Sequence, residues 1–301
     1  MQTIFKHQMG TADLQELSLP GGQRTSWREY GAATGEPLIF CNGWPGSSEQ
    51  GMCLHALGER LGFRIIAPDR PGFGRSTPQP GRGLLDWPPV VAAIADHLNL
   101  QKFALMGISG GGPYVLATAW ALGSRVRAVC LCCTAVPTHL PEARRGLHAG
   151  YRGLLKLNEI APNGLRTALC ALAWMMRIPI PTALLHLSLK WLLPKPDAAA
   201  LSDRAMFDLF APSYRAAMRA GGGALYEDGH PYTVPWPFAV EEINVPVRMW
   251  HGTQDANFQI DLARRLAARL GSVAFFERDE GHYSIAFRCA EEMLRDLKSL
   301  L

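Results

Sequence analysis

Residues 103–114 read Phe-Ala-Leu-Met-Gly-Ile-Ser-Gly-Gly-Gly-Pro-Tyr, an apolar run that breaks sharply at one serine, Ser109, flanked by glycines. An apolar run followed by Gly-x-Ser-x-Gly and helix-forming residues predicts a strand, a tight turn and a helix. Such a reversal brings Gly107 and Gly111 close to neighbouring backbone, where a Cβ would clash. Pro113 falls in the first turn of the expected helix, where a missing N–H is harmless. The pattern therefore places Ser109 at the turn.

Ser109 has two interpretations at this stage. A serine before a helix is often an N-cap, whose hydroxyl accepts a backbone N–H. Alternatively, Gly107-Ile108-Ser109-Gly110-Gly111 is the sharp turn that exposes a nucleophilic serine. A serine nucleophile also requires a histidine, an acid and hydrogen-bond donors for an oxyanion. The rest of the chain must supply these groups at the same edge of the fold if the second interpretation holds.

The composition is that of an ordinary globular protein. Hydrophobic residues make up 48% of the 301 residues and charged residues 19%, so a substantial core is easily buried and disorder is not expected. The formal net charge is +4, but the basic residues are mostly scattered arginines rather than runs or a stripe. This distribution argues against nucleic-acid binding.

The cysteines and the apolar segments bear on the compartment. The cysteine count is odd, most cysteines lie inside apolar segments, and none has the paired spacing of a zinc site, so they are interpreted as reduced core thiols. They are Cys41, Cys53, Cys130, Cys132, Cys133, Cys170 and Cys289. Residues 1–7 form no hydrophobic signal segment, and no uncharged apolar run approaches the length of a membrane span. We therefore expect a cytoplasmic protein without a membrane span.

Short apolar strands alternate with helical segments along most of the chain. Pro20-Gly21-Gly22 separates two alternating segments and predicts a hairpin at the start of the sheet. Strands are expected at 14–19, 25–30, 37–41, 64–68, 103–108, 126–132, 246–250 and 273–276, and helices at 50–61, 90–98, 260–270 and 290–300. This alternation predicts an α/β fold with a mostly parallel sheet covered on both faces.

The pattern changes between residues 137 and 234, which contain no good strand candidate. Helices are expected there at 165–176, 182–193 and 203–220. An all-helical insertion after the sixth strand predicts a cap (lid) domain at 137–234, leaving 1–136 and 235–301 as the core domain. The insertion holds 11 lysines and arginines against 7 acidic residues, so the whole net charge lies on it. A solvated basic face explains this charge better than an anionic substrate, and the apolar helices pack in the core or roof a hydrophobic pocket.

Candidate partners for Ser109 follow two strands beyond the insertion. Asp255 follows the strand at 246–250, and His282 follows the last strand. Loops at the carboxyl ends of parallel strands converge on one edge of a sheet, so these distant residues should meet there. His251 as the base and Asp279 as the acid are weaker alternatives. The order serine, acid, histidine therefore predicts a nucleophile, an orienting acid and a general base.

With these motifs, the chain resembles the α/β-hydrolase superfamily, specifically its capped branch of esterases, C–C bond hydrolases, epoxide hydrolases and haloperoxidase-like enzymes. The resemblance covers nearly the whole chain outside the insertion. It rests on the elbow at 107–111, on Asp-Arg-Pro-Gly-Phe-Gly-Arg-Ser at 69–76, on His-Gly-Thr-Gln-Asp at 251–255 and on Gly-His at 281–282. The glycine-rich loop at 69–76 lacks both nucleotide-binding patterns and is interpreted as a structural turn.

The resemblance also implies an oxyanion hole. Its two donors would be the backbone N–H groups of Trp44 and Gly110. The family's usual His-Gly is Asn42-Gly43 in this chain; because asparagine can also hydrogen-bond to hold a loop, we expect the hole to survive. Family dehalogenases and epoxide hydrolases carry an aspartate at the elbow, so Ser109 argues against both chemistries.

These features predict a cofactor-independent serine hydrolase that cleaves a hydrophobic ester, thioester or lactone through an acyl-enzyme. A C–C bond hydrolase of a diketone-type compound would use the same residues, and the fold also hosts cofactor-free oxygenases and lyases. A non-catalytic ligand receptor is a third class. No metal is expected, and His139, His148, His186 and His230 of the insertion are interpreted as surface or packing residues. The oligomeric state is left open, with a homodimer as one option.

Overall fold

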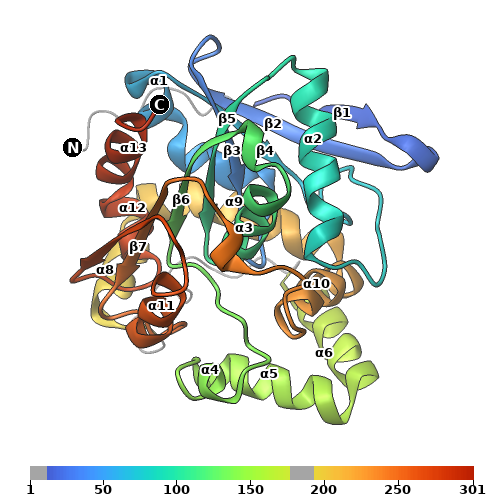
Figure 1. Ribbon diagram of the computed structural model, residues 1–301. Coiled ribbons are helices and arrows are strands. Elements are labelled where there is room, and N and C mark those ends of the chain that lie inside the picture. Colours follow the sequence, from blue (N-terminus) through green and yellow to red (C-terminus); the bar gives the residue numbers. More distant parts are fainter. Residues whose placement is uncertain (1–11, 177–192) are drawn as a thin grey trace.

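The computed structural model describes residues 12–176 and 193–301. Within them, eight strands form one sheet in the order β1-β2-β4-β3-β5-β6-β7-β8 (Figure 1). The β1–β2 and β2–β4 pairs are antiparallel, and every other neighbouring pair is parallel. The strands are β1 (Gln15–Ser18), β2 (Arg24–Gly31), β3 (Glu36–Cys41), β4 (Phe63–Pro68), β5 (Phe103–Ile108), β6 (Val126–Cys132), β7 (Val247–Gly252) and β8 (Val273–Arg278). The predicted hairpin and mostly parallel sheet are therefore confirmed.

Helices cover both faces of the sheet, which explains why the central strands are almost wholly apolar. Side chains of α2, α3 and α11 pack with the strands in one hydrophobic cluster, and those of α1, α12 and α13 pack in a second on the other face. These helices are α1 (His55–Leu61), α2 (Trp87–His97), α3 (Gly111–Ala121), α11 (Ile260–Ala267), α12 (Ser284–Arg288) and α13 (Ala290–Lys298). The helix expected at 50–61 begins as a 3-10 helix, Ser48–Leu54, before α1.

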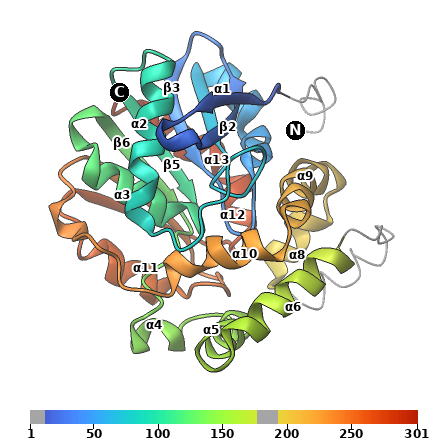
Figure 2. The same ribbon diagram turned by 90° about the vertical axis from the view of Figure 1, so that its right-hand side faces the viewer.

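The chain between β6 and β7 is helical wherever the structure describes it as regular. We call the described helices between β6 and β7 the cap helices. They are α4 (Pro141–Arg145), α5 (Ala149–Ile160), α6 (Pro162–Met175), α8 (Lys195–Ser202), α9 (Arg204–Ala220) and α10 (Gly222–Gly229). In Figure 2, α5 and α6 form an outer arm and α10 lies between α6 and the core. The expected helix at 182–193 lies outside the described residues except for its last position, whereas α6 and α9 match the expectations at 165–176 and 203–220.

The cap helices have their own small hydrophobic cluster. Leu165 and Leu169 of α6, Met218 of α9 and Leu225 of α10 pack together there, and Phe73 of the core joins them from the loop after β4. Apolar stripes on short helices bury each other in this way, so the insertion packs against the core as well as within itself. Among the described residues, no helix is long and apolar enough to cross a membrane.

Candidate active site

Ser109 occupies the sharp turn between β5 and α3. Its φ is +52°, a left-handed conformation that an L-residue adopts at a cost of roughly 1 kcal/mol or more. The turn is tight because a Cβ on Gly107 would lie 2.9 Å from the carbonyl group of Gly111, and a Cβ on Gly111 would collide with the carbonyl of Cys41. Ser109 donates its backbone N–H to Cys132 O at 2.9 Å, and the N-cap of α3 is Gly110 rather than Ser109. Both glycine predictions are confirmed.

The loops after β7 and β8 bring Asp255 and His282 to Ser109. His282 Nε2 lies 3.0 Å from Ser109 Oγ, and His282 Nδ1 lies 2.8 Å from Asp255 Oδ2. All three side chains are buried. This is the geometry in which an imidazole accepts the proton of a serine while a carboxylate holds its other nitrogen. Three residues separated by up to 173 positions thus form one hydrogen-bonded chain.

Asp255 is itself held by the backbone of its loop. Its Oδ1 accepts the N–H groups of Asn257 at 2.7 Å and Phe258 at 3.0 Å, which leaves Oδ2 for His282. His251 Nε2 lies 3.3 Å from Asp255 Oδ2 but 2.7 Å from Phe258 O, so its ring is tied to the main chain rather than to Ser109.

The weaker acid candidate lies elsewhere. Asp279 is exposed and accepts hydrogen bonds from Gln254 at 2.7 Å and Thr253 at 3.3 Å. Of the two carboxylates considered from the sequence, the structure therefore brings only Asp255 to His282.

Burial and charge shift the pKa values of His282 and Asp255 in opposite directions. Burial disfavours the imidazolium of His282, but the carboxylate of Asp255 outweighs burial and raises the pKa of His282 well above its ordinary value. Burial likewise opposes ionisation of Asp255, yet His282 and the hydrogen bonds lower the pKa of that carboxyl. For His251, burial is the larger effect and lowers the pKa, so this ring is neutral at pH 7. The pair Asp255–His282 is therefore suited to carry a positive charge transiently on the imidazole.

Two backbone N–H groups lie beside Ser109 with their directions fixed by the preceding carbonyls. In a trans peptide, the N–H points opposite to the C=O. Ser109 O accepts the N–H groups of Gly112 and Ala135, at 3.1 and 2.9 Å, and this fixes the Gly110 N–H. A Cβ on Gly110 would lie 3.1 Å from Trp44 N, so the Trp44 backbone lies close to Gly110 at the elbow. This arrangement fits the expected oxyanion hole.

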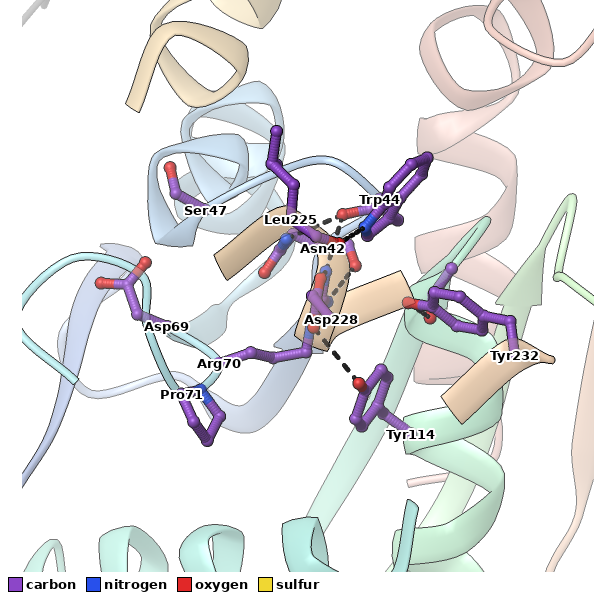
Figure 3. Close-up of polar contacts among 12 residues, drawn as sticks. Asn42, Trp44, Ser47, Asp69, Arg70, Pro71, Tyr114, Leu225, Asp228 and Tyr232 are labelled. Carbon is purple, nitrogen blue, oxygen red and sulfur yellow. Dashed lines mark hydrogen bonds and ion pairs between the residues drawn. The ribbon is translucent and has the colours of Figure 1, made fainter. Parts of the chain in front are cut away.

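Asn42 stabilises the loop that carries Trp44. Its Nδ2 donates to Gly43 O at 2.9 Å, while Gln50 Oε1 accepts the Gly43 N–H at 2.7 Å. Arg70 adds a second donor, with Nη2 at 3.0 Å from Gly43 O, and its Nη1 lies 2.6 Å from Asn42 O (Figure 3). Because Gly43 O has two donors, the Gly43–Trp44 peptide plane is fixed and the Trp44 N–H points away from them. Asparagine thus holds the loop, as expected from the sequence.

Arg70 is paired with a carboxylate of the cap helices. Its Nε and Nη2 lie 2.8 and 2.7 Å from the two oxygens of Asp228 in α10 (Figure 3). Arg82 forms a second ion pair with Asp228, and the hydroxyl of Tyr114 donates to the same carboxylate at 3.2 Å. Burial opposes ionisation of Asp228, but the two guanidinium groups outweigh it and hold the pKa of that carboxyl below its ordinary value. The loop at 69–76 is therefore a structural turn, as predicted, that also connects core and cap.

Two cavities meet at Ser109. A cavity of about 100 Å³ lies under the cap helices, and a second, of about 90 Å³, lies toward α9 and the His282 loop. Trp44, Ser109 and Tyr151 line both. The first cavity is almost wholly apolar and is lined by Leu147, Leu154, Leu155, Leu165, Leu169, Leu225 and Phe258, among others. No Lys, Arg, Asp or Glu of the described residues lines it. A bound molecule can therefore extend in two directions from Ser109, one of them into a mostly apolar cavity.

Among the described residues, one group of side chains could hold a metal ion. It consists of Cys133, Asp255 and His282, whose ligand atoms lie within 4.8 Å of one another. A metal on His282 Nδ1 would displace the hydrogen bond to Asp255 that orients the ring. Burial raises the pKa of Cys133 well above its ordinary value, which keeps this thiol protonated and a poor ligand.

A family model described as alpha/beta hydrolase fold matches residues 36–288, which include every strand from β3 to β8 and all three members of the hydrogen-bonded chain. The chain belongs to the α/β-hydrolase fold family. In this α/β-hydrolase chain, Ser109, Asp255 and His282 follow β5, β7 and β8, and the helical insertion follows β6.

Individual relatives share only part of this α/β-hydrolase chain. The dihydrolipoyllysine-residue acetyltransferase component of an acetoin cleaving system from Pseudomonas putida is 36% identical over 145 residues, which are 47% of this chain and 38% of that protein. Haloalkane dehalogenase 2 from Mycobacterium bovis is 38% identical over 101 residues, 33% of this chain and 35% of that protein. The chain thus spans little more than a third of these curated relatives.

A solved structure matches over nearly the whole α/β-hydrolase chain. A thermophilic esterase from Thermogutta terrifontis has a TM-score of 0.67 at 18% identity, and the match covers 96% of this chain and 97% of that one. At this identity, the likeness concerns the fold.

Several residues of the site had no signal in the sequence. Asp228 is an acid inside a short helix, and nothing local distinguishes it from a surface acid. Cys133 is a buried free thiol of the core, as expected, and it also lies beside His282. His230, interpreted as a surface or packing residue, lines the apolar cavity, whereas His148 caps α5 by accepting the Gly150 N–H. His139 is half-buried, and His186 lies outside the described residues. For Asp228, the sequence offered one indirect hint. If Arg70 of the 69–76 motif is buried, it requires a carboxylate partner somewhere in the chain.

Proposed function

We propose that this protein is a serine hydrolase that cleaves a neutral, hydrophobic carboxylic ester, thioester or lactone through an acyl-enzyme. The observation that carries the proposal is the hydrogen-bonded chain Ser109–His282–Asp255 at the junction of two cavities. A serine at this elbow, with a histidine 3.0 Å away, supports attack by oxygen on an acyl carbon. No cofactor takes part in this chemistry.

In the acylation step, Ser109 Oγ attacks the carbonyl carbon while its proton passes to His282 Nε2. Asp255 stabilises the resulting imidazolium through Nδ1–H. The carbonyl oxygen becomes an oxyanion that accepts hydrogen bonds from the N–H groups of Trp44 and Gly110. Collapse of the intermediate expels the alkoxide, which takes the proton from His282 Nε2. Water, deprotonated by the same nitrogen, then attacks the acyl-enzyme carbonyl. Collapse of this second intermediate releases the acid, and the proton on His282 Nε2 passes to Ser109 Oγ.

The apolar cavity supports a hydrophobic substrate rather than an anionic one. Its described lining holds no Lys, Arg, Asp or Glu, so a carboxylate or phosphate there would lose hydration without an ionic partner. None of the described lysines and arginines of residues 137–234 lines this cavity. We propose residues 137–234 as the cap domain that shapes this cavity, and 1–136 with 235–301 as the core domain.

Labelling with a fluorophosphonate probe tests the proposal. We expect a covalent adduct on Ser109 that is absent in Ser109→Ala and slow to form in His282→Ala. A matched control is His97→Gln, because His97 ends α2 and its ring packs against Trp27 rather than against the Ser109 site. Turnover of 4-nitrophenyl esters of increasing acyl length then shows how long an acyl chain the apolar cavity accommodates. If the active protein stays unlabelled and Ser109→Ala keeps its turnover, the acyl-enzyme is excluded, and a histidine-based oxygenase or lyase becomes the better assignment. Release of a ketone from a diketone without ester turnover would identify a C–C bond hydrolase.

The state of the cysteines supports the cytoplasm as the place of action. All seven are free thiols, and five of them are buried. Thiol titration of freshly prepared protein should count seven groups after unfolding; a smaller number would show that disulfides form.

A further inference from the structure

Two carboxylates of the cap helices are buried against the catalytic loops rather than exposed on the cap. Asp197, in the first turn of α8, is 1% exposed, and Asp228, in α10, is completely buried. Burying an ionised carboxylate is costly unless hydrogen bonds or countercharges replace water. Each of these residues must therefore have such partners, and the partners belong to the core.

Asp197 binds the backbone of the loop that carries His282. Its Oδ2 accepts the N–H of His282 at 2.9 Å, and its Oδ1 accepts the N–H groups of Tyr283 and Ser284, both at 2.8 Å. A Cβ on Gly281 would collide with the same carboxylate, so the loop and Asp197 lie in direct contact. Three consecutive N–H groups are thus fixed by one side chain, 85 to 87 positions away in the sequence.

Asp228 acts on the other half of the site. It holds the guanidinium of Arg70 with two hydrogen bonds, and Arg70 in turn donates to the carbonyls of Asn42 and Gly43 (Figure 3). The Gly43 carbonyl belongs to the peptide whose N–H is that of Trp44. Without Asp228, the buried guanidinium would lose its partner carboxylate and its fixed position. Gly43 O would then keep only Asn42 as a fixed donor, so the direction of the Trp44 N–H would be held less firmly.

We propose that Asp197 and Asp228 are positioning residues through which the cap completes the catalytic site, Asp197 by holding the general base and Asp228 by holding the oxyanion loop. The inference rests on the proposed serine-hydrolase function. The cap helices then have two roles: they hold the catalytic loops in position, and they line the substrate cavity. Ser213 of α9, whose hydroxyl accepts the Ser47 N–H at 2.9 Å beside the oxyanion loop, reinforces the same contact.

The test for Asp197 compares it with a matched acid of the same region. Asp203 caps α9 by accepting the N–H groups of Ala205 and Met206, but it is exposed and does not touch the His282 loop. In Asp197→Asn, an amide oxygen in place of Oδ1 keeps two of the three contacts, whereas Asp197→Ala loses all three. We expect kcat to fall roughly 10-fold in Asp197→Asn and 100-fold in Asp197→Ala, with KM changed less than about twofold. Asp203→Asn should leave both constants unchanged.

The test for Asp228 uses its neighbour as the control. Glu227 lies on the same helix and accepts the Gly81 N–H at 2.9 Å, away from Ser109. Asp228→Asn should lower kcat roughly 10- to 100-fold and slow fluorophosphonate labelling in parallel, because both reactions develop an oxyanion. Glu227→Gln should have neither effect. An equal loss in both variants, or a rise in KM alone, would overturn the assignment of Asp228.

A readout independent of catalysis separates positioning from general stability. In protein labelled with ¹⁵N-histidine, the Nδ1–H proton of His282, hydrogen-bonded to Asp255, should give a far-downfield resonance. We expect this resonance in the wild type, in Asp203→Asn and in Glu227→Gln, and its loss or exchange broadening in Asp197→Ala. All variants are measured well below their thermal unfolding transitions. If Asp197→Ala keeps the resonance, or if cooling restores its kcat, the positioning role is refuted.

The same measurements distinguish the inference from the proposed function. If Ser109 of the wild type takes no label, the hydrolase proposal fails, while the resonance still reports whether Asp197 holds His282. If Asp197→Ala is too unstable to measure, Asp197→Asn with its milder expected loss decides the question. An unaltered kcat and an unaltered His282 resonance in Asp197→Asn would then refute the positioning role of Asp197.

Discussion

The orientation of His282 depends on one carboxylate oxygen, and Asp255→Asn tests it directly. Asp255 Oδ1 accepts two backbone N–H groups, from Asn257 and Phe258, while Oδ2 accepts the Nδ1–H of His282. In the asparagine variant, the amide oxygen must stay on the two N–H groups. In the reverse orientation, the amide NH₂ would point at the N–H groups of Asn257 and Phe258. Both hydrogen bonds would be lost, at a cost of about 1–3 kcal/mol each.

The amide NH₂ of the variant then donates to His282 Nδ1 and forces the other tautomer. In that tautomer, the proton is on Nε2, 3.0 Å from Ser109 Oγ, so the ring cannot accept the serine proton. A wrong tautomer of this kind lowers kcat by a factor on the order of 10⁴, or about 5 kcal/mol of barrier. The fold should be unaffected, since aspartate and asparagine have nearly the same shape.

The assay is kcat/KM for a 4-nitrophenyl ester, together with the rate of fluorophosphonate labelling. Asp279→Asn is the matched control because Asp279 is exposed and accepts hydrogen bonds from Thr253 and Gln254 rather than from His282. We expect it to keep wild-type activity. The reasoning is refuted if Asp255→Asn stays within tenfold of the wild type, or if Asp279→Asn shows the large loss instead.

Three further predictions concern pH, strain and the cavity. Because the raised pKa of His282 favours the protonated ring, kcat/KM should fall as pH decreases, with a midpoint above about 6.5; Asp255→Ala should lower that midpoint, and an unchanged pH profile would contradict the pairing. Ser109→Gly should be more stable than Ser109→Ala by about 1 kcal/mol in urea unfolding, because glycine adopts the +52° φ without strain; equal stabilities would show that the turn is relaxed. Leu154→Trp should lower kcat/KM for a 4-nitrophenyl octanoate at least tenfold while the acetate changes less than about twofold, since a larger ring fills part of the apolar cavity; a parallel loss for both esters would place the acyl chain elsewhere.

The sheet and the catalytic order could be read from the sequence because both depend on local patterns. Continuous apolar runs such as 103–108 identify strands that are buried on both faces. The elbow at 107–111 was recognisable because its glycines are required by close backbone approach, a local constraint. Parallel strands all end at the same edge, so residues such as Asp255 and His282 needed only strand-end positions to be placed near Ser109.

The cap was predictable in kind but not in detail. Its helical periodicity gave α6 and α9, but periodicity does not say which face of a helix meets which part of the core. The net positive charge of the insertion suggested an anionic substrate as an alternative, whereas the cavity beneath it is apolar. Side-chain direction, rather than composition, decides what lines a cavity.

By itself, the sequence determined the fold and the chain Ser109–His282–Asp255, since strand pattern and order suffice for both. Only the tertiary structure decided the partners of Arg70, the contacts of Asp197 and Asp228 with the catalytic loops, and the shape of the two cavities. These depend on side chains from helices more than 80 positions away, which meet the core loops through packing. A buried aspartate and a solvated aspartate are the same residue type in the sequence, and only their surroundings in the folded protein distinguish them.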